Sequence, residues 1–397
     1  MLSVSNLLCD IEAGNEKLRY GHRATDADPH AVPRPVVVWA LTKACNLRCV
    51  HCYASAGAHP APGELSHSEA LTLIDDLARF KVPALLLSGG EPLMRPDIIP
   101  LIRYARYRGL ACTLSTNGTL IDDAMARSLA EVGLKYVGLS LDGAAATHDK
   151  LRGAQGAFDR SVAAIDRCVQ RGIKIGVRFT AHALNIADMD TIFDLCARHH
   201  VNRLCIYHLA YSGRGQGMQR VDLTADQTRR MVDKIFAKCR EFHAAGIPLE
   251  ILTVDNHADA AYLLLQMEKT DPDRAAAIHQ RLAGTGGNRS GCNIAAIDPV
   301  GNVHYDQFSW HYNCGNVRKE PFSEIWSSAR NERLAILRHR RPHLPERCQQ
   351  CRFLDVCNGN LRTRAEAATG DWLGFDPGCY LTDAEIGLRH LECLQSH

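Results

Sequence analysis

The chain has 397 residues, which is enough for two or three folding units of ordinary size. Its 46 basic and 44 acidic side chains nearly cancel, which excludes a globally basic nucleic-acid binder and an acidic tail protein. Apolar residues make up 46% of the chain, yet no run approaches the roughly 20 residues that cross a bilayer, so we expect a soluble protein.

From residue 36 onward, short apolar runs alternate with amphipathic stretches. The runs do not alternate strictly, which is typical of parallel strands covered on both faces. They predict strands at 36–41, 84–88, 111–115, 136–140, 173–180 and 203–209. Helical periodicity predicts helices at 67–80, 98–108, 121–132, 158–171 and 188–200. Ser66 or Ser68 is expected to cap the first helix and Asp122 the third. These six repeats predict an α/β fold whose parallel sheet curls into a partial barrel, with functional residues at the strands' C-terminal ends.

The pattern changes after residue 223. We expect a helix at 224–245, a strand at 247–254, helices within 258–283, a glycine-rich break at 284–288, and a hairpin of 293–298 with 302–305. Residues 314–397 are expected to be rich in loops. We therefore predict an N-terminal segment with room for a short helix, a partial barrel, a linking segment and a C-terminal extension, at 1–35, 36–245, 246–291 and 292–397.

The chain contains 16 cysteines, and because its first residues have no basic segment followed by a long apolar run, we expect no secretory signal. We expect a cytoplasmic protein, and in that reducing compartment so many thiols indicate metal or redox chemistry. Cys45, Cys49 and Cys52 follow the first predicted strand. Thiolates at this spacing can hold three corners of an iron–sulfur cube and leave the fourth iron open to a small molecule. A zinc site lacking one ligand, or buried structural thiols, would also explain three cysteines alone.

Motifs at the ends of the next strands resemble those of the radical S-adenosylmethionine (SAM) superfamily. They are Ser88-Gly89-Gly90-Glu91-Pro92, Ser115-Thr116-Asn117-Gly118 and Ser140-Leu141-Asp142-Gly143. The resemblance implies a [4Fe-4S] cluster on the catalytic Cys45, Cys49 and Cys52. It also implies SAM contacts from His51, Gly89, Gly90, Glu91, Pro92, Ser115, Asn117, Ser140, Asp142, Arg178 and Leu209. Within this set, the glycines let backbone approach a ligand, and the Glu91 carboxylate is expected to face the methionyl ammonium.

The same resemblance implies the chemistry. The open iron chelates SAM, a low-potential donor such as flavodoxin or ferredoxin supplies one electron, and a 5′-deoxyadenosyl radical takes a hydrogen atom from the substrate.

A second cysteine set comprises Cys348, Cys351, Cys357 and Cys379. Its spacing alone fits either zinc or an iron–sulfur cluster. Following such a barrel, the set resembles the SPASM (twitch-like) extension, which implies one auxiliary [4Fe-4S] cluster. That extension usually has a further cysteine where this chain has Leu361.

The missing cysteine leaves alternatives open. A second auxiliary cluster would need Cys292 and Cys314 with His304 or Asp306 as non-cysteine ligands. The other cysteines are expected to be small buried residues: Cys9, Cys112, Cys168, Cys196, Cys205, Cys239 and Cys393. Arginines near the second set either offset cluster charge or form a solvated face: Arg338, Arg340, Arg341, Arg347, Arg352, Arg362 and Arg364.

Several segments resemble the haem-biosynthesis branch of this superfamily: 207–215, 252–259, 301–308 and 358–362. The resemblance implies an iron tetrapyrrole substrate, 12,18-didecarboxysiroheme, from which NirJ-type enzymes of haem d1 formation in denitrifiers remove two propionates. The C-terminal residues favour that reaction. AhbC-type removal of two acetates, in siroheme-dependent haem synthesis, and a peptide-modifying enzyme remain alternatives. Candidate substrate residues are Arg152, His208, Tyr211, Arg214, His257 and Arg289, and His208, His257 or His304 could approach the iron axially.

Overall fold

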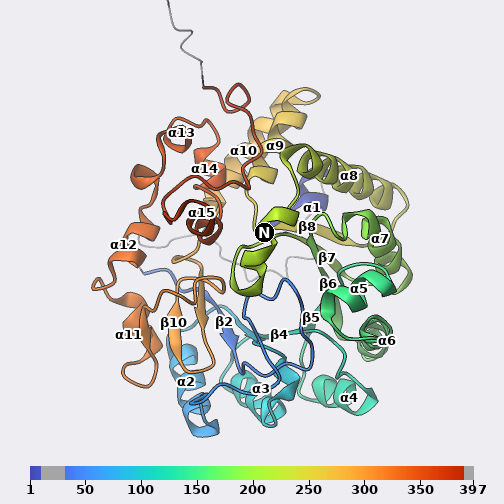
Figure 1. Cartoon of the computed structure of the whole chain (residues 1–397), viewed down its shortest axis with the longest axis vertical. Helices are drawn as coiled ribbons and strands as arrows, with labels where there is room; N and C mark the ends of the chain where they lie inside the picture. Colours follow the sequence, from blue (N-terminus) through green and yellow to red (C-terminus); the bar gives the residue numbers. More distant parts are fainter. Residues whose placement is uncertain (10–31, 389–397) are drawn as a thin grey trace, which may run out of the picture.

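A computed structural model describes residues 1–9 and 32–388. In this part of the chain, eleven strands form one sheet in the order β1-β8-β7-β6-β5-β4-β3-β2-β9-β10-β11 (Figure 1). Most of the predicted N-terminal segment and Cys393 lie outside the described residues.

The centre of the sheet consists of the predicted strands. They are β2 (Val36–Ala40), β3 (Leu85–Ser88), β4 (Cys112–Thr116), β5 (Tyr136–Ser140), β6 (Lys174–Ala181) and β7 (Arg203–His208). Neighbouring strands in this set are parallel and follow chain order, for example with Leu114 opposite Val137. The predicted α/β partial barrel is therefore confirmed.

The predicted helices cover the outside of these strands (Figure 1). They are α2 (His67–Arg79), α3 (Ile98–Tyr107), α4 (Asp123–Glu131), α6 (Ala157–Gln170), α7 (Met189–Arg198) and α8 (Ala225–Ala244). Ser66, rather than Ser68, caps α2 in a reciprocal arrangement with Glu69, and Asp122 caps α4. Short 3₁₀ turns η2 (Pro92–Met94), η3 (Ile186–Asp188) and η4 (Gly213–Val221) join some of these elements.

The prediction missed α5 (Ala145–Arg152), which follows β5 and lies against the cysteine loop. The helix is short, has no side-chain N-cap, and is mostly polar, so its sequence carries little helical periodicity. It ends at Gly153, whose φ of 67° suits a residue without a side chain.

The sheet extends past the predicted barrel at one edge. There β8 (Glu250–Val254) continues the parallel order beside β7. The N-terminal β1 (Leu2–Ser3) then pairs antiparallel with β8 and leads into the short helix α1 (Val4–Leu8). A helix in this segment was expected, but a two-residue strand has no readable pattern and its pairing was not predicted.

The other edge carries β9 (Ile294–Ile297), which is parallel to β2, and the antiparallel β10 (Asn302–His304) and β11 (Gly315–Asn316). The predicted hairpin around residues 299–301 is thus confirmed, and it attaches the C-terminal extension to the barrel sheet. The sheet therefore crosses the predicted boundaries at residues 246 and 292, and the division into domains stays a prediction.

Beyond β8 and the hairpin the chain is helical in short pieces. These are α9 (Ala258–Glu268), α10 (Pro272–Thr285), α11 (Phe322–Ser327), α12 (Glu332–Arg338), η5 (Arg341–His343), α13 (Glu346–Gln349), α14 (Leu354–Cys357) and α15 (Arg362–Thr369). Loops join these short pieces, in agreement with the expected loop-rich region after residue 314. The α-helices after residue 321 are four to eight residues long, which is too short for helical periodicity to be recognised in the sequence.

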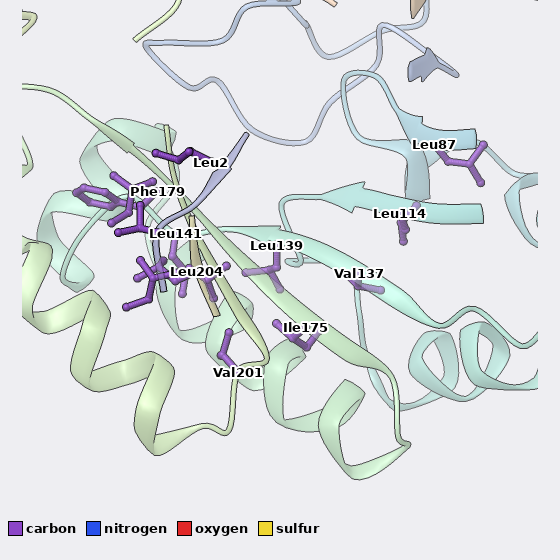
Figure 2. Packing of buried hydrophobic residues seen from close by; sticks show 14 of the residues in the cluster. Leu2, Leu87, Leu114, Val137, Leu139, Leu141, Ile175, Phe179, Val201 and Leu204 are labelled. Atoms are coloured by element: carbon purple, nitrogen blue, oxygen red, sulfur yellow. The ribbon is translucent and has the colours of Figure 1, made fainter. Parts of the chain in front are cut away.

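The core lies between the strands and the covering helices. Leu114, Val137, Leu139, Ile175 and Leu204 from four neighbouring strands are fully buried there (Figure 2). Each such side chain contributes roughly 1.5–3 kcal/mol relative to exposure. This packing fixes the strand ends that carry the predicted motifs. No helix within the described ranges is both long and apolar enough to cross a membrane.

Candidate functional site

A cavity of about 720 Å³ runs through the barrel, from the first residues of strands such as β2 and β5 to the C-terminal ends of the strands, and is bordered by the C-terminal extension. This volume is within the usual range for small-molecule sites. Most of the predicted residues line it: Cys45, Cys49, His51, Cys52, Gly89, Gly90, Ser115, Asn117, Ser140, Arg152, Arg178, His208, Leu209, Arg214, His257 and Arg289. Glu91, Pro92, Asp142 and Tyr211 do not line it.

The loop after β2 brings Cys45, Cys49 and Cys52 into one small apolar cluster facing this cavity. Nitrogen donors point at their sulfurs. The Leu47 N–H lies 3.4 Å from Cys45 Sγ, and Arg152 Nη1 lies 3.4 Å from Cys49 Sγ. Burial raises the pKa of Cys45 to about 12, so a thiolate here needs a metal for compensation. Three thiols with N–H donors and an open side fit a cluster with one free iron.

The glycines after β3 bring their backbone against this loop. Gly90 donates its N–H to the Thr42 carbonyl at 2.7 Å, and a side chain at Gly90 would collide with the Ala44 carbonyl oxygen. Gly89 has a φ of 141°, which favours glycine. The close approach joins the second strand's motif to the cysteine loop, and both glycines face the cavity.

Glu91 is hydrogen-bonded to protein groups, and its contact with the methionyl ammonium stays a prediction. Its carboxylate is fully buried and accepts from the Asn117 N–H at 2.8 Å and from the Thr116 hydroxyl at 2.7 Å. A third donor, the Leu93 N–H, lies 3.1 Å away. Burial raises the pKa of Glu91 to about 7, although these hydrogen bonds lower it. The carboxylate therefore holds the end of β4.

Asp142 lies behind the cavity wall and organises residues that line it. Its carboxylate contacts Arg152 Nη2 at 2.5 Å and His51 Nε2 at 3.1 Å. It also accepts from the Thr180 N–H at 3.3 Å, while its own N–H donates to His148 Nδ1 at 3.1 Å. Burial alone would raise the pKa of Asp142, but the Arg152 and His51 charges hold it well below its usual range. Asp142 thus positions other groups and is not placed to touch a ligand.

Three predicted substrate contacts are engaged elsewhere. Arg152 bridges Asp142 and Cys49, and Arg214 donates to the carbonyls of Cys49 and Ala56 at 2.7 Å each. Both arginines therefore hold the cysteine loop. The Tyr211 hydroxyl donates to Asp222 at 2.7 Å, outside the cavity lining. Sequence alone could not assign these partners because they come from distant segments.

The histidines proposed as axial ligands differ in their surroundings. His208 Nε2 lies 2.8 Å from Asp259, and its Nδ1 lies 3.4 Å from Asn256. His304 Nδ1 lies 2.7 Å from the Tyr312 carbonyl, and its ring is absent from the cavity lining. His208 and His304 are therefore poorly placed for axial ligation.

His257 differs from His208, whose ring nitrogens both have polar neighbours, and from His304, which does not line the cavity. It lines the cavity, and its Nδ1 has no hydrogen-bond partner among the described residues. Burial and the charges of Arg340 and Arg364 hold the pKa of His257 well below its usual range, so the ring is neutral.

Several cavity arginines retain a buried nitrogen without a hydrogen-bond partner among the described residues: Nε of Arg152, Arg178 and Arg289, and Nη2 of Arg214. Arg178 donates through Nη1 to Ser115, and Arg289 donates through Nη2 to Asn293 at 3.3 Å. In both, Nε is buried without a partner within residues 1–9 and 32–388. Each guanidinium therefore has donor capacity left for an anionic group.

The second cysteine set also converges. Cys348, Cys351, Cys357 and Cys379 line one small separate cavity, beside Arg347. The Phe353 N–H lies 3.4 Å from Cys351 Sγ, and Arg347 Nη1 lies 3.7 Å from Cys379 Sγ. Burial raises the pKa of Cys348 to about 11. Four thiols around one cavity, with cationic and N–H donors, fit a fully coordinated cluster.

Leu361 occupies the place where a further cysteine was noted as missing. It is buried and packs with Ala210 and Phe308 at the edge of the large cavity. His304 and Asp306, the suggested substitute ligands, are hydrogen-bonded to Tyr312 and Ser290, respectively. The four-thiol site alone therefore retains a complete ligand set within the described C-terminal extension, and one auxiliary cluster remains our prediction.

The remaining cysteines were expected to be structural. Cys168, Cys196 and Cys239 are buried in the core, in agreement with that expectation, and Cys9 is half-buried. Cys112 and Cys205 are also buried but line the large cavity. Other lining residues that the sequence analysis missed include Tyr53, whose hydroxyl lies 3.2 Å from Ser88 Oγ, and Tyr207. Tyr53 directly follows Cys52, and Tyr207 lies near the end of β7, so both positions could have been predicted from the sequence.

The chain matches the family model of the radical SAM superfamily over residues 39–196, and that of an iron–sulfur cluster-binding domain (SPASM) over residues 289–352. It is 47% identical over 395 residues to Fe-coproporphyrin III synthase of Methanosarcina barkeri, covering 98% of this chain and 99% of that protein. It is 43% identical over 357 residues to pre-heme d1 synthase of Dinoroseobacter shibae, covering 89% and 88%. It is 33% identical over 349 residues to AdoMet-dependent heme synthase of M. barkeri, covering 87% and 95%.

Solved structures resemble the fold. SuiB of Streptococcus suis bound to S-adenosylmethionine superposes with a TM-score of 0.70 at 16% identity, covering 88% of this chain and 78% of that one. The enzyme anSMEcpe with bound AdoMet and a peptide gives 0.66 at 17% identity, covering 87% and 94%. At these identities the likeness concerns the fold alone.

Proposed function

Because the chain belongs to the radical SAM superfamily and to its haem-biosynthesis branch, we propose that it removes two carboxylate-bearing side chains from the iron tetrapyrrole 12,18-didecarboxysiroheme. It is a SAM-dependent enzyme that acts on a tetrapyrrole, with a SAM-binding [4Fe-4S] cluster and auxiliary iron–sulfur ligation. When bound, the cluster and SAM supply hydrogen-atom abstraction. We further propose a low-potential flavodoxin or ferredoxin as electron donor.

The observation that carries the proposal is a set of cavity arginines with a buried nitrogen that has no partner among the described residues, in a cavity that also contains the cysteine loop: Arg152, Arg178, Arg214 and Arg289. A tetrapyrrole with several carboxylates needs such cations at its rim. The loop is held by Arg152, Arg214 and the Gly90 backbone, so it presents its thiols in a fixed arrangement.

His257 is the residue we propose for the axial position on the substrate's iron. Neutral imidazole is a common iron ligand, and the low pKa of His257 keeps the ring in that form. The Asn360 side chain interacts with the ring, and its Oδ1 accepts the His257 backbone N–H at 2.8 Å. Asn360 would thus orient the ring from behind.

Two products remain, and specific observations favour each of them. The sequence of residues 351–372 favours the loss of propionates, as in haem d1 formation, and the relative named pre-heme d1 synthase is 43% identical. The relative named Fe-coproporphyrin III synthase is 47% identical over nearly both whole chains. Coproporphyrin retains its propionates, so this likeness favours the loss of acetates.

The deciding experiment incubates the anaerobically reconstituted protein with didecarboxysiroheme, SAM and dithionite, followed by mass analysis. Loss of propionates or of acetates assigns the reaction, and an unchanged substrate refutes the proposal. Arg289→Gln should raise KM with a smaller effect on kcat, because binding of a carboxylate is weakened. The matched control is Arg330→Gln, since Arg330 is 73% exposed and pairs with Glu320 on the surface.

A further inference from the structure

Arg362, the first residue of α15, has an unusual environment. Its side chain is 0% exposed, and Nη1 donates to the Gly374 carbonyl at 2.8 Å. Its Nε and Nη2 are buried and have no hydrogen-bond partner in the described part of the chain. A buried guanidinium with unmet donors is costly unless a negative group compensates it.

The carboxylate that interacts with Arg362 is that of Asp376, which is already hydrogen-bonded to other groups. Asp376 accepts from Arg364 Nε at 2.7 Å and from Arg364 Nη2 at 2.9 Å. It also accepts from the backbone N–H groups of Leu361 and Gly378, at 2.9 Å each. Two buried guanidinium groups, Arg362 and Arg364, therefore interact with Asp376, and of the two it is Arg364 that is hydrogen-bonded to it.

The backbone before Arg362 lies beside the second cysteine cavity. Asn360 and Asp376 line that cavity together with the four thiols, and Asp376 accepts the Leu361 N–H at 2.9 Å. Burial and the charge of Arg364 lower the pKa of Arg362. The charge of Asp376 raises this pKa, as the charges of Cys357 and Cys348 would. Arg362 is therefore close to two of the thiols expected to hold the auxiliary cluster.

We propose that Arg362 is the buried counter-cation of the auxiliary iron–sulfur cluster and raises its midpoint potential. A four-thiolate cluster carries net negative charge, which adds to the compensation that Asp376 gives Arg362. When the cluster accepts one electron its negative charge grows, and a fixed cation stabilises that state more than the oxidised state. Arg362 stays protonated throughout, and no bond forms or breaks.

The other arginines of this stretch are satisfied by protein groups. Arg347 pairs with Asp383 at 2.7 Å, and Arg340 donates to Asn288, Ser290 and Leu337. Arg352 follows Cys351 directly but is 44% exposed and pairs with Glu268 on the surface. Arg347 also contacts a cluster thiol, Cys379, at 3.7 Å, but it shares its charge with Asp383, while Arg352 behaves as a solvated residue. Among the described arginines from 338 to 364, Arg362 is the one with buried nitrogens that have no hydrogen-bond partner.

The test uses the full-length chain with Cys45, Cys49 and Cys52 replaced by Ala, so that only the auxiliary site binds iron. The midpoint potential of the reconstituted cluster is measured by a redox titration followed by EPR, in Arg362→Met, Arg362→Lys and Arg352→Met backgrounds. At a fixed potential, Arg362→Met should lower the ratio of reduced to oxidised cluster at least tenfold, a fall of ~59 mV for a one-electron couple. Arg362→Lys should retain most of the wild-type potential, and Arg352→Met should match it.

An unchanged potential in Arg362→Met would overturn the proposal, as would an equal shift in Arg352→Met. If Arg362→Met assembles no cluster, the iron content and midpoint potential of Arg362→Lys test the proposal instead. Iron content and potential near those of the parent chain support a role for the charge. Loss of the cluster in Arg362→Lys as well refutes it, because the shape of the guanidinium would then matter and its charge would not. Failure of the parent chain itself to bind iron also overturns it.

Discussion

The Arg152 guanidinium joins a buried carboxylate to a cysteine of the catalytic loop, so its removal has a calculable cost. In Arg152→Met, Asp142 loses its contact at 2.5 Å while both groups remain at positions that are at most 9% exposed in the wild type. Breaking a buried pair from one side ordinarily costs about 3–5 kcal/mol. Asp142 keeps His51 at 3.1 Å and the Thr180 N–H at 3.3 Å, so we expect the lower end, about 3 kcal/mol.

The assay is urea unfolding of the cluster-free protein, with the midpoint compared at constant slope. The second variant is Arg152→Met with Asp142→Asn, which removes the orphaned charge. It should recover more than half of the lost stability, because the penalty comes from an uncompensated carboxylate. The control is Arg318→Met, because Arg318 pairs with Glu69 where both are about one-third exposed; we expect a cost of about 0–1 kcal/mol.

Two results would refute this reasoning. Arg152→Met could lose no more stability than Arg318→Met, which would mean that the buried pair is not energetically coupled. Alternatively, the double variant could be as unstable as the single variant, which would assign the cost to lost packing of the Arg152 side chain. The same variants report on the loop, since Cys49 also loses its N–H donor at 3.4 Å, and iron retention at the first cluster should fall in both.

Three further predictions follow from the cysteines and from one surface pair. Cys49→Ala should abolish formation of 5′-deoxyadenosine, whereas Cys168→Ala, in the core, should not; persistent turnover in Cys49→Ala would contradict the mechanism. The reconstituted protein should bind about eight irons, four per cluster, and about twelve would indicate a second auxiliary cluster. Arg229 donates to Glu385 at 2.6 Å and holds the pKa of Glu385 at about 2, below its usual 4.5. Because that carboxylate is stabilised in its ionised form, Arg229→Gln should cost stability above pH 4.5. The cost should shrink as the pH falls from 4.5 toward 2, and a cost independent of pH over that window would exclude the pair as its source.

The central strands were predictable from sequence because each is covered on both faces and reads as an apolar run. Leu114 and Val137 illustrate this, since both are fully buried and lie opposite each other on neighbouring strands. The pairing of β1 with β8 was not predictable, because the paired residues Leu2 and Thr253 lie far apart in the sequence. A strand of two residues is too short to show a pattern from which its partner strand could be predicted.

The cluster residues could be predicted because thiol spacing and position after a strand are local properties. The roles of charged residues could not be predicted, because a charged side chain acts through its partners, and these come from segments far apart in the sequence. Arg152 and Arg214 were expected to grip carboxylates of a substrate, but they hold the Cys49 segment. Glu91 was expected to face a ligand, and the hydrogen bonds that it accepts at the end of β4 could not be predicted from the sequence.

The same principle explains why Arg362 stands apart from the arginines around it. Sequence shows only that basic residues gather near the second cysteine set, which is equally consistent with a solvated face. The contacts divide them: Arg347, Arg352 and Arg364 each pair with a carboxylate, and Arg362 does not. Arg362 is fully buried with two unpartnered nitrogens, and the carboxylate that acts on it, Asp376, is hydrogen-bonded to Arg364, which fits a further negative group supplied from outside the polypeptide. In this chain, the thiols of Cys348 and Cys357 place that group in the auxiliary cavity.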